Sequence, residues 1–138
     1  MKCSVVKEFT FDAGHRVLGH GGKCKHLHGH TYKGLVEVSA TRLNELYMVV
    51  DFYDLKQALS PCIAEWDHVM ILSVADPLGR DLLALGQQVR LIEGNATVER
   101  MAHILFEKLT KALDSVCIVE KVVLWETPTS SAVVEREI

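Results

Sequence analysis

The chain has 138 residues, of which 49% are hydrophobic and 24% are charged, the balance of one ordinary globular domain. This composition excludes a disordered chain, a collagen and a small disulfide scaffold. No apolar run reaches the length of a membrane span, and the N-terminal residues show no secretory signal. The formal charge is −3, without the lysine and arginine clusters that nucleic acids bind. We therefore expect one soluble, cytoplasmic domain over residues 1–138 that binds neither nucleic acid nor membrane.

The first half of the chain predicts two strands and a helix. Apolar and polar residues alternate over 2–12 and again over 28–42, a period that is typical of half-buried strands. Residues 13–27 between them are rich in glycine and predict a loop. Apolar residues from Phe52 to Trp66 recur in steps of three and four, so we expect a helix there. Pro61 should kink or divide that helix, because proline removes a backbone donor.

The second half predicts a loop, a helix and two strands. Residues 73–94 indicate a loop with one helical turn and a short extended piece at 89–92. Asn95 is expected to cap a helix with an apolar face from Val98 to Leu113. Residues 116–125 and 132–138 predict two closing strands. The resulting order β-β-α-α-β-β predicts an α+β domain, with both helices on one face of an antiparallel sheet.

Histidines are concentrated near the N-terminus. Five of the seven fall within sixteen residues: His15, His20, His26, His28 and His30. His28 and His30 are two residues apart on a predicted strand, so both imidazoles point to the same face and can reach one metal ion. His15 ends the neighbouring strand and is the third ligand that we expect. Three neutral imidazoles suit Zn²⁺ and leave a fourth coordination position for water or substrate.

Cys24 lies in the glycine-rich loop between Lys23 and Lys25. Neighbouring positive charge lowers the pKa of a thiol and favours the reactive thiolate. Three interpretations remain open for this residue: a fourth zinc ligand in a closed structural site, a base or nucleophile beside an open zinc site, or a cysteine without a role.

Other polar residues are weaker candidates. Asp67 precedes His68, and such a pair can relay protons, although adjacent residues need not interact. Glu126 ends an apolar strand, where it could accept hydrogen bonds from a ligand or face solvent. Thr97 and Glu99 open a helix, and interaction with the helix dipole is the default explanation for Glu99. No role is assigned to His20, His26 and His103.

Taken together, these motifs resemble the 6-pyruvoyl- and 6-carboxy-tetrahydropterin synthase family. The similarity spans nearly the whole chain, in order, through the segments 9–16, 22–32, 48–56, 67–68, 95–99 and 126–127. The resemblance implies a tunnelling fold, in which β-β-α-α-β-β subunits assemble through their sheets into a homohexamer with active sites at subunit interfaces. It also implies a pterin substrate, 7,8-dihydroneopterin triphosphate.

The family's functional residues transfer to matching positions of this chain. The resemblance implies that zinc is bound by His15, His28 and His30. It implies that Cys24 is the general base, that Asp67 and His68 shuttle a proton, and that Glu126 anchors the pterin, with Thr97 and Glu99 as further pterin contacts. Zinc would hold the hydroxyls of the substrate side chain and acidify the adjacent C–H bonds.

The spacing of Cys24 and His28 resembles the bacterial and archaeal enzymes that form 6-carboxy-5,6,7,8-tetrahydropterin for 7-deazaguanine and queuosine biosynthesis. That reaction releases acetaldehyde and triphosphate. Two alternatives stay open, a 6-pyruvoyl-tetrahydropterin synthase and a non-catalytic pterin-binding module of the same fold. Ala96 and Arg100 stand where the family often has proline and asparagine, which could alter the pterin pocket.

Overall fold

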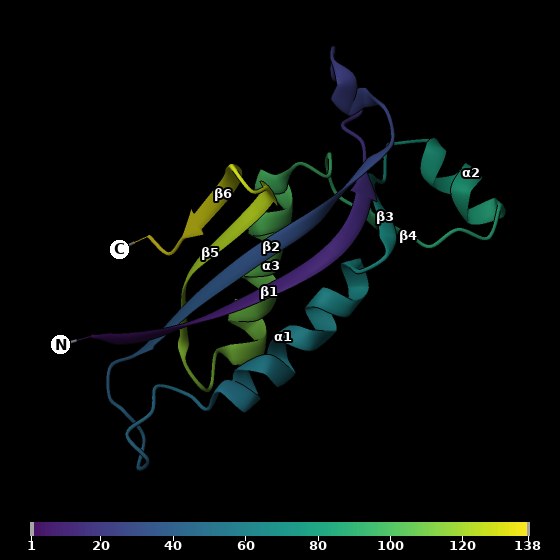
Figure 1. Cartoon of the computed structure of the whole chain (residues 1–138). Coiled ribbons are helices and arrows are strands. Elements are labelled where there is room, and N and C mark those ends of the chain that lie inside the picture. The colour runs from purple at the N-terminus through teal and green to yellow at the C-terminus, as the bar shows by residue number, and fades with distance from the viewer. Residues whose placement is uncertain (1, 138) are drawn as a thin grey trace.

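A computed structural model describes residues 2–137, which form one six-stranded sheet with helices against it (Figure 1). In chain order the elements are β1 (Cys3–His15), a short 3-10 turn (Lys23–Lys25), β2 (His28–Ala40), α1 (Phe52–Trp66), β3 (Val69–Ser73), α2 (Leu78–Ala84), β4 (Val89–Ile92), α3 (Val98–Leu113), β5 (Ile118–Thr127) and β6 (Ser130–Glu135). No helix among these residues is long and apolar enough to cross a membrane.

The sheet has the strand order β4-β3-β1-β2-β5-β6. The four strands β1, β2, β5 and β6 pair antiparallel, as the sequence predicts. The α+β class is confirmed, but the sheet as a whole is mixed, because β3 runs parallel to β1 and β4 runs parallel to β3. The sequence did not predict β3, since its continuous apolar run lacks the alternation of a half-buried strand.

The hydrophobic core lies between the sheet and the helices α1 and α3, which cover one face (Figure 1). Phe11 and Tyr32 stack there with ring centroids 5.0 Å apart. Gly34 is opposite Phe9 in the register, and a Cβ at Gly34 would lie 2.0 Å from the Phe9 ring. Glycine therefore makes room for an aromatic ring on the covered face. We call the other side of β1 and β2 the open face.

Pro61 lies inside α1, which continues as one helix from Phe52 to Trp66. Of the two outcomes expected at Pro61, a kink or a division of the helix, the division was therefore wrong. Proline in a helix interior costs roughly 3 kcal/mol, whereas burial of one large apolar side chain stabilises by about 1.5–3 kcal/mol. The helix buries Leu55, Leu59 and Trp66 against the sheet, while Pro61 is exposed. Tertiary packing of the apolar face thus outweighs the local cost.

The clearest predicted helix is α3, but its cap differs from the expectation. Thr97, rather than Asn95, is the N-cap, and its hydroxyl oxygen accepts a hydrogen bond from the Arg100 N–H at 3.1 Å. The Asn95 side chain instead forms hydrogen bonds with Leu18 in the loop between β1 and β2. The region 73–94 also holds more structure than a single turn, since α2 spans seven residues and the extended piece at 89–92 is β4.

Candidate metal centre and active site

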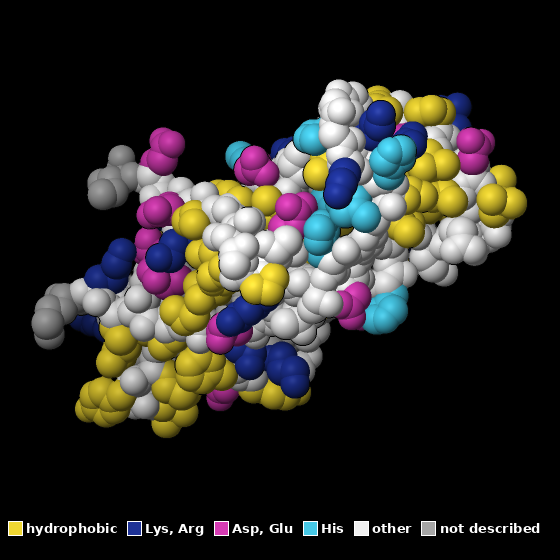
Figure 2. Space-filling model, turned by 45° about the horizontal axis from the view of Figure 1, so that its top comes forward, with side chains coloured by type: hydrophobic (Ala, Val, Ile, Leu, Met, Phe, Trp, Pro, Cys, Tyr) yellow, Lys and Arg dark blue, Asp and Glu magenta, His cyan; other side chains and the backbone are white. Residues whose placement is uncertain are grey.

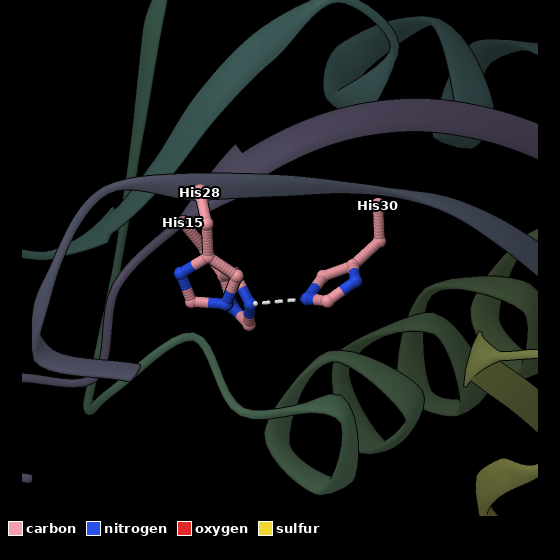
Figure 3. Close-up of side chains that lie close together, drawn as sticks. All are labelled: His15, His28 and His30. Carbon is pink, nitrogen blue, oxygen red and sulfur yellow. Dashed lines mark hydrogen bonds between the residues drawn. The ribbon is translucent and has the colours of Figure 1, made fainter. Parts of the chain in front are cut away.

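His15, His28 and His30 converge on the helix-covered face at one end of the β1–β2 pair (Figure 3). The register places His15 opposite His28 and Ala13 opposite His30. Side chains alternate along strands, so all three imidazoles share one face. Their ring centroids are 4.5–5.0 Å apart. The expected convergence of these residues is thus present in the fold.

The spacing of the nitrogens fits a tetrahedral metal. His15 Nε2 and His30 Nε2 are 3.2 Å apart, and one ligand atom from each histidine lies within 4.8 Å of the others. Zinc–nitrogen bonds of about 2.0–2.1 Å at the tetrahedral angle require nitrogens about 3.3 Å apart. His15 and His30 already have this spacing, and a side-chain shift would bring His28 onto the same ion.

Backbone carbonyls fix the outer nitrogens of two of these rings. His15 Nδ1 lies 2.6 Å from the carbonyl oxygen of Ala96, and His28 Nδ1 lies 2.7 Å from that of His26. A carbonyl only accepts, so each Nδ1 carries the proton and each Nε2 presents a lone pair. Such outer hydrogen bonds orient histidine ligands in metal sites. The donor set therefore suits zinc in both chemistry and tautomer.

Burial favours the neutral form of two of the three histidines, His15 and His30. Desolvation lowers the pKa of His15, against the hydrogen bond to Ala96, which raises it. Desolvation also lowers the pKa of His30, against the nearby charge of Glu126. Metal binding requires unprotonated imidazole, so this environment favours the ligating form at neutral pH.

Glu126 faces the same centre from the end of β5. Its Oε1 lies 3.3 Å from His15 Nε2 and 3.6 Å from His30 Nε2. It also borders a hollow of about 610 Å³ that is lined by His30 and, from the open face, by Thr31 and Lys33. The carboxylate is therefore placed to accept hydrogen bonds from a ligand that enters beside the histidines.

Tyr32 is a neighbour of the centre that the sequence analysis did not single out. It is fully buried, and its hydroxyl has no hydrogen-bond partner among the described residues. Burial, followed by the negative charge of Glu126, raises the pKa of Tyr32 far above its usual value, so the hydroxyl stays neutral. Its position two residues beyond His30 on the same face was a signal that could have identified it.

Cys24 lies in the 3-10 turn of the loop between β1 and β2, and it is half-buried. The three-histidine set within the described residues does not include its thiol. This arrangement favours the open zinc site over the closed site with Cys24 as fourth ligand. The carbonyl of Cys24 accepts a hydrogen bond from the Val17 N–H at 2.8 Å, which joins the two sides of the loop.

Two side chains anchor the base of this loop. The Asn95 amide bonds both backbone groups of Leu18, accepting its N–H at 3.0 Å and donating to its carbonyl at 2.9 Å. Arg16 donates two hydrogen bonds to the buried carboxylate of Asp76. These bonds hold the pKa of Asp76 below its ordinary value. The segment that fixes His15 through Ala96 therefore also fixes the loop that carries Cys24.

Asp67 and His68 do form a pair, with Asp67 Oδ1 3.0 Å from His68 Nδ1. The backbone of Asp12 holds both, since its N–H donates to Asp67 Oδ1 at 3.0 Å and its carbonyl accepts the His68 N–H at 2.6 Å. The hydrogen bond from Asp12, and then that from His68, lower the pKa of Asp67. No local sequence pattern indicated that Asp12 orders this pair.

This pair does not lie beside the three histidines of its own chain. Asp12 and Thr31, which hydrogen-bond each other, alternate along their strands with Ala13 and His30 and therefore point to the open face. His68 and Asp12 border a second hollow, of about 590 Å³, which His28 and His30 also line. The ligand atoms of His68, Asp67 and Asp12 nevertheless form a group of their own, distinct from that of the three histidines.

The remaining candidates have structural contacts. Thr97 caps α3, and Glu99 is exposed in its first turn, where an acidic side chain favours the helix dipole. His103 pairs with Glu107 on the surface of α3 at 3.1 Å. His20 Nδ1 accepts the Gly22 N–H at 2.8 Å within the loop.

Comparison with known proteins shows the family of this chain. The family model described as 6-pyruvoyl tetrahydropterin synthase matches residues 4–137. The chain belongs to this family. A 6-carboxy-5,6,7,8-tetrahydropterin synthase from Aquifex aeolicus is 36% identical, over 99% of this chain and 100% of the relative. The Haemophilus influenzae protein of the same name is also 36% identical, over 91% and 94% of the two chains.

Solved structures agree with membership of the 6-pyruvoyl tetrahydropterin synthase family. An uncharacterized protein from Wolinella succinogenes superposes with a TM-score of 0.88 at 26% identity, covering 99% of each chain. A 6-pyruvoyltetrahydropterin synthase from Plasmodium vivax superposes with a TM-score of 0.78 at 19% identity, over 100% of this chain and 99% of the other. The second likeness shows the fold alone, the tunnelling fold of the family.

Proposed function

We propose that this chain is a zinc-dependent lyase that converts 7,8-dihydroneopterin triphosphate to 6-carboxy-5,6,7,8-tetrahydropterin. The reaction takes up one water and releases acetaldehyde and triphosphate. The observation that carries this proposal is the three-histidine centre, in which one nitrogen of each ring lies within 4.8 Å of the others, in a chain whose relatives bear that enzyme's name. We propose that this reaction serves 7-deazaguanine and queuosine biosynthesis and takes place in the cytoplasm.

The three histidines would hold the metal, which when bound supplies Lewis acidity to the hydroxyls of the substrate side chain. Glu126 accepts hydrogen bonds from the pterin ring, because its carboxylate borders the hollow beside His30. Cys24, in the loop that joins the two histidine-bearing strands, removes a proton from the substrate side chain.

Asp67 and His68 handle the second proton transfer. The Asp67 carboxylate accepts a hydrogen bond from His68 Nδ1, which leaves His68 Nε2 to exchange a proton with the substrate. Because this pair lies on the open face, we propose that it serves the metal centre of a neighbouring subunit. An active site built between subunits supports the homohexamer that the family resemblance implies. The outer edges of β4 and β6 are available for pairing between subunits.

The competing product is 6-pyruvoyl-tetrahydropterin, which forms from the same substrate by loss of triphosphate without loss of carbon. The family model and the Plasmodium vivax structure bear that name. The curated relatives at 34–37% identity are instead named for the carboxy product, which favours the carboxy reaction for this chain.

The decisive experiment supplies purified, zinc-loaded protein with 7,8-dihydroneopterin triphosphate and analyses the product by mass spectrometry. The expected pterin product retains one of the three side-chain carbons, and acetaldehyde appears in equal amount. A product with all three carbons would identify the pyruvoyl reaction. Binding of substrate without any product would identify a non-catalytic pterin-binding module.

Substitution of Cys24 by Ala tests the base. We expect turnover to be lost while zinc content stays at the wild-type level. Loss of zinc in this variant would instead assign Cys24 as the fourth ligand of a closed site.

A further inference from the structure

The loop between β1 and β2 lies within the longest stretch of the chain without acidic residues, residues 13–36. No aspartate or glutamate occurs between Asp12 and Glu37, although the whole chain has a net charge of −3. The loop itself, residues 16–27, carries five basic or potentially basic side chains: Arg16, His20, Lys23, Lys25 and His26. Figure 2 shows lysine, arginine and histidine side chains gathered at this end of the molecule. The loop is therefore a local positive surface on an acidic protein.

Two of these charges are free for a ligand. Arg16 is neutralised by Asp76, but within residues 2–137 no carboxylate lies at ion-pair distance from Lys23 or Lys25, and both are exposed. His20 is also exposed. Because its Nδ1 accepts the Gly22 N–H, its Nε2 carries a proton and is a further donor.

The loop is ordered by hydrogen bonds rather than free to move. The Asn95 amide holds Leu18, and Val17 donates to the carbonyl of Cys24 across the loop. The His26 carbonyl accepts His28 Nδ1, which ties the far end of the loop to the metal centre. The lysines on either side of Cys24 therefore have a defined position relative to the histidines.

We propose that Lys23 and Lys25, together with His20, bind the triphosphate chain of the substrate. This inference rests on the proposed function. In dihydroneopterin triphosphate the triphosphate is attached to the carbon next to the hydroxyl-bearing carbons, so it must emerge directly beside the metal centre. The loop that joins His15 to His28 lies there, and it carries the unpaired lysines.

The choice of residue type agrees with this role. Lysine is a compact point charge that attracts phosphate without a fixed bidentate geometry. Such contacts bind a polyanion and also stabilise the additional charge that develops as triphosphate leaves. They are screened by salt, because both lysines are exposed.

The test uses the double variant Lys23→Gln/Lys25→Gln in a Cys24→Ala background, so that binding is measured without turnover. A matched control, Lys56→Gln/Lys111→Gln, removes two exposed lysines from α1 and α3 and changes the net charge equally. Calorimetry measures the Kd of inorganic tripolyphosphate, of dihydroneopterin triphosphate and of dihydroneopterin, which lacks phosphate.

We expect the loop variant to bind tripolyphosphate and the triphosphate substrate at least about tenfold more weakly at low salt. The difference should shrink in high salt, and the Kd of dihydroneopterin should not change. Equal weakening in the control pair, or unchanged tripolyphosphate binding in the loop variant, would overturn the proposal. Failure of the proposed enzyme activity is a separate result, because it appears as absence of product with the wild-type protein while these Kd values are still measured.

Discussion

Two clusters of titratable side chains lie on opposite faces of the same two strands, and they are built differently. His15, His28 and His30 form a partly buried set whose nitrogens converge on one point. Asp67 and His68 form an exposed pair, ordered by the backbone of Asp12. The first cluster is complete within one chain. The second presents a proton-transfer group outward, which is useful only if another surface meets it.

Removal of one of the three imidazoles should abolish metal binding at the first cluster. In His28→Ala we expect zinc affinity to fall about 100-fold or more, since loss of even an outer hydrogen-bond partner of a ligand costs 10–100-fold. Turnover should be lost with the metal. Zinc content after dialysis, measured by elemental analysis, checks this, and His103→Ala on the far helix surface is the control that should keep its zinc.

Removal of the exposed pair should leave the metal in place. In His68→Gln we expect full zinc content and a kcat lower by about 100- to 10,000-fold, the range for loss of a general acid or base. If the pair serves a neighbouring subunit, co-expression of His28→Ala with His68→Gln should restore part of the activity, because mixed assemblies contain intact sites. Absence of any recovery would contradict a site that is shared between subunits.

Asp76 and Asp67 show the same difference between a buried and an exposed group. The pKa of each carboxyl is lowered, but only Asp76 is buried. Arg16 stabilises the charged form of Asp76 in the folded state, so this contribution to stability is present above the ordinary pKa of 3.8 and is lost as pH falls through the lower folded-state pKa. Asp76→Asn should cost about 3 kcal/mol in unfolding free energy at neutral pH.

Urea denaturation between pH 7 and pH 2.5 measures this effect. The wild-type protein should lose more stability with acid than Asp76→Asn does. Parallel pH profiles for the two proteins would show that the Arg16–Asp76 pair contributes nothing to folding. Asp67→Asn should change stability little, because that carboxylate is exposed.

The smallest expected effect concerns Thr97. The family resemblance implies that it contacts the pterin, whereas in the structure its side chain caps α3. Thr97→Ala should lower the unfolding free energy by about 1 kcal/mol, and Thr97→Ser should restore most of it. If capping is its role, KM for the pterin substrate stays at the wild-type level in Thr97→Ser. A KM that rises in this variant despite restored stability would assign a direct pterin contact.

The sequence predicted the convergence of the three histidines because its signal is local and periodic. Two histidines at i and i+2 must share a face, and two adjacent strands joined by one loop bring His15 opposite His28. The same reasoning predicted the main strands and α3, whose apolar faces are long and regular.

What the sequence did not predict depends on contacts between distant segments. The strand β3 is a short apolar run without alternation, and it becomes a strand only by pairing with β1. Asn95 was predicted to cap α3, but its side-chain amide hydrogen-bonds the backbone of Leu18, 77 residues earlier. The position of Asp67 and His68 on the open face depends on the parallel pairing of β3, so no local pattern could indicate that they lie apart from the histidines.

The most direct test of the account is the product formed from 7,8-dihydroneopterin triphosphate by the zinc-loaded protein. The account predicts 6-carboxy-5,6,7,8-tetrahydropterin with one equivalent each of acetaldehyde and triphosphate, identified by mass spectrometry. A pterin product that keeps all three side-chain carbons, or bound substrate that is never converted, would contradict it.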